Sequence, residues 1–392
     1  MRMESTNMSL KSVIRPGDNL KIDGIPLPVI GPARVYVCGI TPYDTTHLGH
    51  ASTFIWTDLA ARVLRLCGAH VDVCRNVTDV DDHLIAAARA RQVSWQSLAT
   101  QETYRFERDM TDLRIGRPSF EPRSHDHVEE VISLGAVLIE RGLAYQRNGS
   151  VYFKGAKVPE RAGVCRADAL ALTAATSAHS NEADDPLDVA IWQRSTDQDP
   201  RWPSPWGQGR PGWHAECAAM ALATFGPSID LHGGGSDLRF PHHAYEAALS
   251  EALTGVRPFS RAWMHVGAVR FDGEKMAKST GNLVFVHDLV DRCSIGAIRL
   301  MVLSRRWQDD WDFDDATLAA ASSDIDDLWR GHKEGVDHNS ARRQVVEALL
   351  DDLDVPRALT VAREAGGEVL SDLGELLGLH GSAAQWDRPV SS

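Results

Sequence analysis

The segment from residue 35 to residue 77 restricts the possible folds more than any other part of the sequence. Residues 35–38 are a short β-prone run that ends at Gly39, and residues 49–66 carry apolar side chains at helical spacing. Residues 70–77 then alternate as a strand. A strand, a helix and a second strand of these lengths form a right-handed βαβ unit. The sequence therefore predicts an α/β fold with a parallel sheet, whose ligands gather at the carboxyl ends of the strands.

Periodicity along the rest of the chain predicts a mixture of helices and strands. The expected elements are helices over residues 80–141, 213–225 and 241–253, a hairpin over 143–154, strands over 229–231 and 263–271, and helices alone from residue 315. Residues 155–186 form a less regular insertion. We therefore predict a catalytic domain over residues 1–313, with an insertion at about residues 80–210, and a helical domain over residues 314–392.

Composition narrows the class of protein. A chain of 392 residues can bury a full core, and its net charge of -13 argues against a broad surface that grips phosphates. Six cysteines scattered through a chain of this length indicate reduced thiols in a cytoplasm. Residues 1–10 lack an apolar run, and no apolar stretch is long enough to span a bilayer. We therefore expect a cytoplasmic protein with no secretion signal and no membrane partner.

Four residues far apart in the sequence carry side chains that bind metals: Cys38, Cys217, His242 and Glu246. His242 and Glu246 are four positions apart on one expected helix, so their side chains face the same way. Two thiolates, an imidazole and a carboxylate are suitable tetrahedral zinc ligands. His243 is the alternative to His242. A buried cysteine, taken singly, is more often a small core residue than a ligand.

Two basic motifs could bind the phosphates of a nucleotide. His47 and His50 stand where the first helix begins, so their imidazoles and the helix amides can reach a phosphate. Lys275 and Lys278 lie in a downstream loop, where two ammonium groups could neutralise a triphosphate as pyrophosphate leaves. Taken alone, the histidines could be surface residues or a metal pair, and the lysines could belong to an ordinary exposed loop.

The two basic motifs, in this order and at this separation, resemble the signatures of class I aminoacyl-tRNA synthetases. Residues 202–207, 210–214 and 232–237 are similar to the cysteine-activating branch of that family, and the likeness extends from residue 35 to 313 and more faintly to 377. This branch contains cysteinyl-tRNA synthetases and the shorter mycothiol-pathway ligases, which join cysteine to glucosaminyl-inositol. The resemblance implies a Rossmann-like (HUP-type) catalytic domain with helical insertions, one zinc ion per chain, and ATP with Mg²⁺ as a substrate.

The resemblance also implies roles for individual residues. Cys38, Cys217 and His242 would bind zinc with Glu246 as a fourth ligand. The residues that would handle ATP are His47, His50, Lys275 and Lys278. The residues that would form the pocket for a cysteinyl adenylate are Cys38, Gly39, Ile40, Thr41, Thr53, Asn76, Val77, Thr78, Trp213, Gly235, Ser236, Asp237 and Val269.

Three segments suggest the acceptor of the cysteine. The sequences of residues 41–51, 282–286 and 352–359 resemble the mycothiol-pathway ligases more closely than the cysteinyl-tRNA synthetases. The segment after residue 359 leaves little room for an anticodon-binding domain. We therefore predict a monomeric, ATP-dependent cysteine ligase with a small amine acceptor, an amino sugar such as glucosaminyl-inositol.

Three features depart from those ligases. Glu246 is a fourth ligand of the synthetase type, residues 175–186 lack a Glu-Arg-Gly-Gly-Asp-Pro motif, and Ala277 replaces a serine. The alternatives are a compact cysteinyl-tRNA synthetase, a diverged paralogue that uses another small amine, and a non-catalytic module that binds an adenylate.

Overall fold

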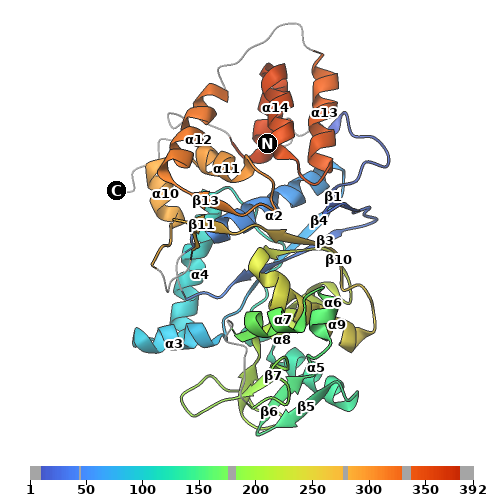
Figure 1. The fold of residues 1–392 in the computed structure, drawn as a ribbon, viewed down its shortest axis with the longest axis vertical. Coiled ribbons are helices and arrows are strands. Elements are labelled where there is room, and N and C mark those ends of the chain that lie inside the picture. The colour runs from blue at the N-terminus through green and yellow to red at the C-terminus, as the bar shows by residue number, and fades with distance from the viewer. Residues whose placement is uncertain (1–9, 44–45, 175–181, 277–280, 329–336, 380–392) are drawn as a thin grey trace.

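A four-stranded parallel sheet forms the centre of the molecule (Figure 1). The computed structural model describes residues 10–43, 46–174, 182–276, 281–328 and 337–379. The order of the strands across the sheet is β10 (Ser260–Val266), β9 (Ile229–Gly235), β3 (Ala33–Ile40) and β4 (Val71–Val77). All three strand pairs are parallel, which confirms the predicted α/β class.

The βαβ unit predicted near the N-terminus consists of β3, α2 (Leu48–Leu66) and β4. Leu48, Ile55 and Leu59 are fully buried, because helix α2 packs between the sheet and the C-terminal helices. His47 caps the helix: its Nδ1 accepts a hydrogen bond of 3.1 Å from the Gly49 amide. Strand and helix boundaries agree with the sequence prediction to within a few residues.

The insertion between β4 and α8 begins with helices and ends in a second sheet. Its helices are α3 (Asp82–Ala90), α4 (Trp95–Asp112), α5 (Val128–Glu140), α6 (Val158–Arg161) and α7 (Arg166–Ala174). The sheet is antiparallel, in the order β5 (Ala144–Arg147), β6 (Ser150–Phe153), β7 (Val189–Arg194) and β8 (Gly209–Pro211). Asn148 and Gly149 both have positive φ, as the two-residue turn of the predicted hairpin requires.

Helices α8 (Trp213–Phe225) and α9 (Ala244–Thr254) flank β9 in sequence, and a helical turn, η3 (Arg239–His243), precedes α9. The single strand predicted over residues 263–271 is wrong, because the chain divides there into β10 and β11 (Val269–Phe271). The break lies at Gly267, where a Cβ atom would be 2.2 Å from the Asp309 carbonyl oxygen. Strand β11 joins a small sheet with β12 (Glu274–Lys275) and β13 (Trp311–Phe313).

Within the described residues, the chain after β13 forms helices only, as predicted: α12 (Asp315–Leu328), α13 (His338–Leu350), α14 (Val355–Ala365) and α15 (Gly367–Leu377). They follow α10 (Val286–Arg292) and α11 (Ile295–Leu303). Leu59 of α2, Leu300 of α11 and Leu373 of α15 belong to one continuous core. The predicted domain boundary near residue 313 stays a prediction.

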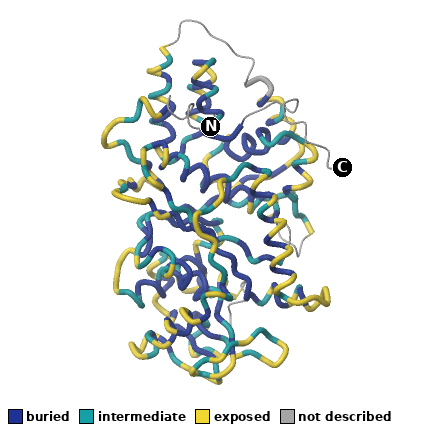
Figure 2. Tube along the Cα trace, turned by 180° about the vertical axis from the view of Figure 1, so that it is seen from behind, coloured by how far each residue is buried: buried dark blue, intermediate teal, exposed yellow. Residues whose placement is uncertain are grey.

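Buried residues run along the interior of the molecule, and exposed residues lie mainly on its outer loops (Figure 2). In the part of the chain that the structure describes, no helix combines the length and the apolar character that crossing a membrane requires.

Candidate active site

The four candidate metal ligands meet at the carboxyl end of the central sheet. Cys38 lies near the end of β3, Cys217 in α8, His242 in η3 and Glu246 in the first turn of α9. All four are buried, and their donor atoms lie within 4.8 Å of one another. The sequence placed His242 and Glu246 on one helix. The structure places His242 in the turn before that helix and keeps the two side chains in contact.

Short contacts connect these side chains, which we call the donor cluster. The Nε2 atom of His242 lies 2.6 Å from Oε1 of Glu246, and the Cys38 thiol donates to the same oxygen at 3.2 Å. The Asn76 side-chain amide donates to the Cys217 sulfur at 3.1 Å. Each donor atom is therefore held in place by a neighbour.

Burial and charge act in opposite directions on the donor cluster. Burial raises the pKa of the Cys38 thiol well above its usual range. Burial also opposes ionisation of Cys217, but the Cys38 thiol and the charge of His242 lower the Cys217 pKa to about 7. Burial disfavours the His242 cation, whereas Glu246 and Cys217 raise the His242 pKa to about 10. Several buried ionisable groups close to one another fit a metal-binding site, since a cation would neutralise the anionic donors.

Two further histidines, His232 and His243, border the donor cluster. His232 was not among the site residues predicted from the sequence. His232 Nε2 lies 2.9 Å from Oε2 of Glu246, and Cys38, His232, His243 and Glu246 form a second group with donor atoms within 4.8 Å. His243 was considered only as a substitute for His242, yet its Nδ1 contacts His265 Nε2 at 2.9 Å. The signal that could have identified His232 is its position at the end of a strand, directly before three glycines.

The predicted adenylate-binding residues at the ends of β3 and β4 contact one another. The Gly39 amide donates to Oδ1 of Asn76 at 2.8 Å, and the hydroxyls of Thr41 and Thr78 are 2.8 Å apart. A Cβ atom on Gly39 would lie 1.8 Å from the Asn76 carbonyl oxygen, so only glycine fits there. The Thr78 amide donates to the carbonyl oxygen of Ile40 at 2.9 Å, next to Val77, the last residue of β4.

The remaining predicted pocket residues come from other elements. The ring of Trp213, at the first position of α8, stacks on His242 with 4.1 Å between centroids. A Cβ atom on Gly235 would lie 3.9 Å from the Thr53 hydroxyl, so the end of β9 approaches α2. Ser236 begins the short helix η2 (Ser236–Leu238). Val269 is buried in β11.

The segment that follows the second predicted nucleotide-binding motif lies beside the first. The rings of His47 and His50 stack with 3.8 Å between centroids. The backbone amide of Leu48 donates to the Val284 carbonyl at 2.8 Å, which holds the chain after the lysine loop beside the histidines. Lys275 Nζ lies 2.8 Å from Oδ2 of Asp237. Lys278 and Ala277 lie outside the described residues.

Comparison with known proteins identifies relatives of the chain. The family model for the tRNA synthetases class I (C) catalytic domain matches residues 29–323. A protein of Acidothermus cellulolyticus, named L-cysteine:1D-myo-inositol 2-amino-2-deoxy-alpha-D-glucopyranoside ligase, is 41% identical over 85% of this chain and 84% of its own length. A protein of the same name from Streptomyces coelicolor is 40% identical over 86% of each chain.

Solved structures of low sequence identity share the fold. Methionyl-tRNA synthetase of Mycobacterium tuberculosis, in complex with methionyl-adenylate, has a TM-score of 0.65 and 18% identity, over 88% of this chain and 83% of that chain. A LeuRS of Agrobacterium radiobacter has a TM-score of 0.64 and 11% identity, over 96% and 87% of the two chains. Residues 29–323 match the catalytic domain of the class I tRNA synthetases, and both cysteine ligases are about 40% identical to this chain. The chain therefore belongs to the class I tRNA synthetase family, in the branch that contains these two ligases.

Proposed function

We propose that this protein is an ATP-dependent cysteine ligase. The cysteine carboxylate would attack the α-phosphorus of ATP, which forms cysteinyl adenylate and releases pyrophosphate. The amine of a small acceptor would then attack the carbonyl carbon, which forms an amide, breaks the bond to AMP and releases one proton to solvent. The acceptor we propose is the amino sugar 1D-myo-inositol 2-amino-2-deoxy-alpha-D-glucopyranoside, which the names of the relatives contain.

One observation supports this proposal: a buried donor cluster with two sulfurs lies near the carboxyl end of β3, and His47, at the start of α2, and Lys275, bound to Asp237 just after β9, come from neighbouring parts of the same sheet. Cysteine needs a thiol-binding group, and ATP needs positive charge at its phosphates. We expect the protein to act as a monomer in a cytoplasm. Its six cysteines, all in described ranges, form no disulfide.

We propose that Cys38, Cys217, His242 and Glu246 hold one zinc ion. When bound there, the zinc would prefer the thiolate of cysteine to the hydroxyl of serine, because it is a borderline-soft metal. Glu246 is the hardest of the four donors and the natural one to give way to a substrate sulfur. The chain's own groups orient the ligands, since Asn76 holds the Cys217 sulfur and Trp213 packs against the His242 ring.

We assign the phosphates of ATP, with Mg²⁺, to His47, His50, Lys275 and Lys278. The histidines stand at the N-terminus of α2, where the helix amides favour negative charge. Asp237 holds the Lys275 ammonium group beside the predicted adenylate pocket. The adenylate itself would lie against the ends of β3, β4 and β9.

The Lys278→Ala variant is expected to form cysteinyl adenylate about 100-fold more slowly, because one preorganised positive group at the leaving phosphates is lost. The measurement is cysteine-dependent exchange of labelled pyrophosphate into ATP. Zinc content should stay at the wild-type level. Lys154→Ala, on the exposed end of the second sheet, is the matched control and should behave as wild type. Unchanged exchange in Lys278→Ala would remove this lysine from the proposed mechanism.

The acceptor is tested by incubating the purified protein with cysteine, ATP and 1D-myo-inositol 2-amino-2-deoxy-alpha-D-glucopyranoside, with mass spectrometry to detect the amide. A parallel reaction contains tRNA specific for cysteine. Charging of tRNA is the second candidate function, and one observation favours it: Glu246 contacts Cys38 and His242 as a synthetase-type fourth ligand would. Charged tRNA without any amide would overturn the amino-sugar assignment and leave cysteine activation in place.

A further inference from the structure

A cavity lies beside the donor cluster, between the insertion and the start of α8. Its empty volume is about 360 Å³, part of which is open to solvent. The polar residues that line the cavity are Asp81, Asp82, Gln193, Trp213, His214 and Glu216. Neither the predicted metal site nor the predicted nucleotide motifs include it.

The cavity is separated from the donor cluster by the thickness of one side chain. Trp213 lines the cavity and stacks on His242 with 4.1 Å between ring centroids. His214 also lines the cavity, and its Nδ1 lies 2.8 Å from Nδ1 of His242. A molecule in the cavity would therefore be close to a cysteine whose sulfur is held at the donor cluster.

The cavity wall offers carboxyl and amide groups, which suit amines and hydroxyls. Asp81, Asp82 and Glu216 supply carboxyl groups and Gln193 supplies an amide, and the wall contains neither lysine nor arginine. An ammonium group would be attracted to the carboxyl groups of this wall. Burial raises the pKa of Asp81, so a cation bound nearby would offset the carboxylate's loss of hydration.

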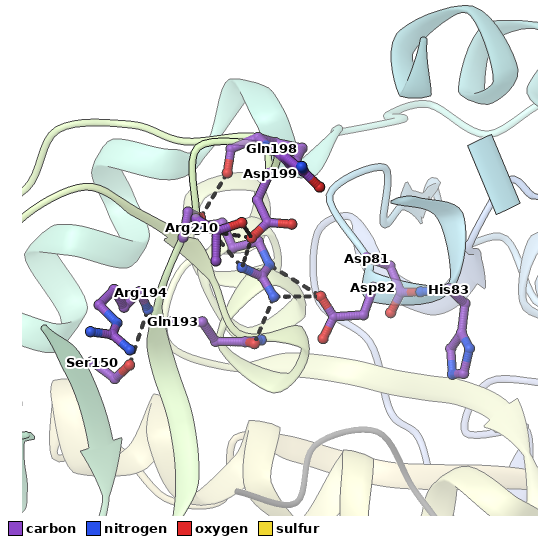
Figure 3. A network of polar contacts seen from close by, with 12 residues as sticks. Asp81, Asp82, His83, Ser150, Gln193, Arg194, Gln198, Asp199 and Arg210 are labelled. Carbon is purple, nitrogen blue, oxygen red and sulfur yellow. Dashed lines mark hydrogen bonds and ion pairs between the residues drawn. The ribbon is translucent and has the colours of Figure 1, made fainter. Parts of the chain in front are cut away.

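A single arginine behind the wall fixes two of these side chains (Figure 3). Arg210 donates from Nη2 to Oδ1 of Asp82 at 2.7 Å and to Oε1 of Gln193 at 3.3 Å. On its other side, Nη1 of Arg210 lies 3.8 Å from Oδ2 of Asp199. Arg210 thus engages Oδ1 of Asp82 and Oε1 of Gln193, and does not contact Oδ2 of Asp82 or Nε2 of Gln193. An acceptor and a donor of hydrogen bonds are thus held in place beside the cavity.

A buried nitrogen that lacks a partner is an independent sign of a ligand. His214 is 1% exposed, and its Nε2 has no hydrogen-bond partner among the described residues. Its other ring nitrogen is engaged by His242. Because an unpaired buried polar atom is costly, a ligand hydroxyl in the cavity would stabilise this side chain.

We propose that this cavity is the acceptor subsite and binds a polyhydroxylated molecule that carries an amine. Asp82 and Gln193 bind its amine and hydroxyl groups, and His214 binds a further hydroxyl. This assignment rests on the proposed function, since only transfer to a small amine requires such a subsite.

The test separates acceptor binding from cysteine activation. Asp82→Asn and Gln193→Ala should each raise the KM for 1D-myo-inositol 2-amino-2-deoxy-alpha-D-glucopyranoside by about 10- to 100-fold, the effect of losing a hydrogen bond to a charged or preorganised group. Cysteine-dependent pyrophosphate exchange should stay within about twofold of wild type, and kcat should change less than KM. Asparagine keeps the oxygen that Arg210 contacts, so Asp82→Asn preserves the wall.

Asp199→Asn is the matched control, because Asp199 contacts the same arginine but does not line the cavity. If KM rose as much in this variant, the rise in Asp82→Asn would come from disturbance of Arg210 and its contacts. That result would overturn the subsite. Equal losses of exchange and ligation in Asp82→Asn would overturn it as well.

Direct binding of the same amino sugar is measured by calorimetry in the presence of a non-reactive sulfamoyl analogue of cysteinyl adenylate. The expected result is binding to wild type and weaker binding to Asp82→Asn and Gln193→Ala. Binding that both variants retain at wild-type strength overturns the subsite alone. Failure of the wild type to bind the sugar overturns both the subsite and the amino-sugar acceptor, and pyrophosphate exchange then reports whether cysteine activation survives.

Discussion

The Cys217→Ala variant is expected to lose its zinc and its cysteine-dependent pyrophosphate exchange together. Cys217 is 1% exposed, and its sulfur lies among the donor atoms of Cys38, His242 and Glu246. Loss of a partner that only orients a metal ligand lowers metal affinity about 10- to 100-fold, so loss of a ligand should cost about 100-fold or more. Without the metal, the site would lose the group that prefers a thiolate to a hydroxyl. Zinc content is measured by mass spectrometry of metals, and activation by exchange.

Cys74→Ala is the matched control for this experiment. Cys74 is equally buried and packs in the same apolar cluster as Cys38 and Cys217, but it is absent from both groups of candidate ligands. Its thiol donates a hydrogen bond to the Thr224 hydroxyl at 3.9 Å. This variant should keep its zinc and its exchange activity. Full zinc occupancy in Cys217→Ala would show that the metal assignment is wrong.

The central part of the fold was predictable because its signals are local. Helical spacing over residues 49–66, between two β-prone runs, leaves few arrangements other than a βαβ unit. The carboxyl ends of parallel strands share one edge of the sheet, and at that edge Gly39 forms a hydrogen bond with Asn76. The proximity of Cys217 and Glu246 was not fixed by spacing alone. It came from the resemblance to a known family.

Features that depend on packing between distant segments were not predictable. The break between β10 and β11 arises from the close approach of the Asp309 backbone to Gly267, about which periodicity carries no information. The acceptor cavity combines the start of α3, strand β7 and the start of α8, and no motif connects Asp82 to Gln193. His214 has the spacing of an ordinary helix residue, and only its contact with His242 reveals its position.

The Arg299→Met variant is expected to lower the free energy of unfolding by about 3 kcal/mol, because it removes a buried charge that joins three segments. Arg299 is 0% exposed. It donates to the carbonyl oxygens of Leu377 at 2.6 Å and Leu113 at 2.9 Å, and to Oδ2 of Asp58 at 3.3 Å. Methionine fills most of the space of the arginine stem but leaves both carbonyl groups without this donor. Burial lowers the Arg299 pKa to about 10, and Asp58 opposes that shift, so the guanidinium stays charged at neutral pH.

Asp58 keeps a second partner in this variant, since Arg62 Nε donates to its Oδ2 at 2.8 Å. For that reason the expected loss is at the lower end of the range for a broken buried ion pair. Urea denaturation measures it, with Arg363→Met as control. Arg363 forms an exposed pair with Asp324 at 3.6 Å, so its replacement should cost less than about 1 kcal/mol. If Arg299→Met were as stable as the control, the contacts of Arg299 would contribute little to the attachment of α15 to α2. Apolar packing in the continuous core would then hold the two helices together.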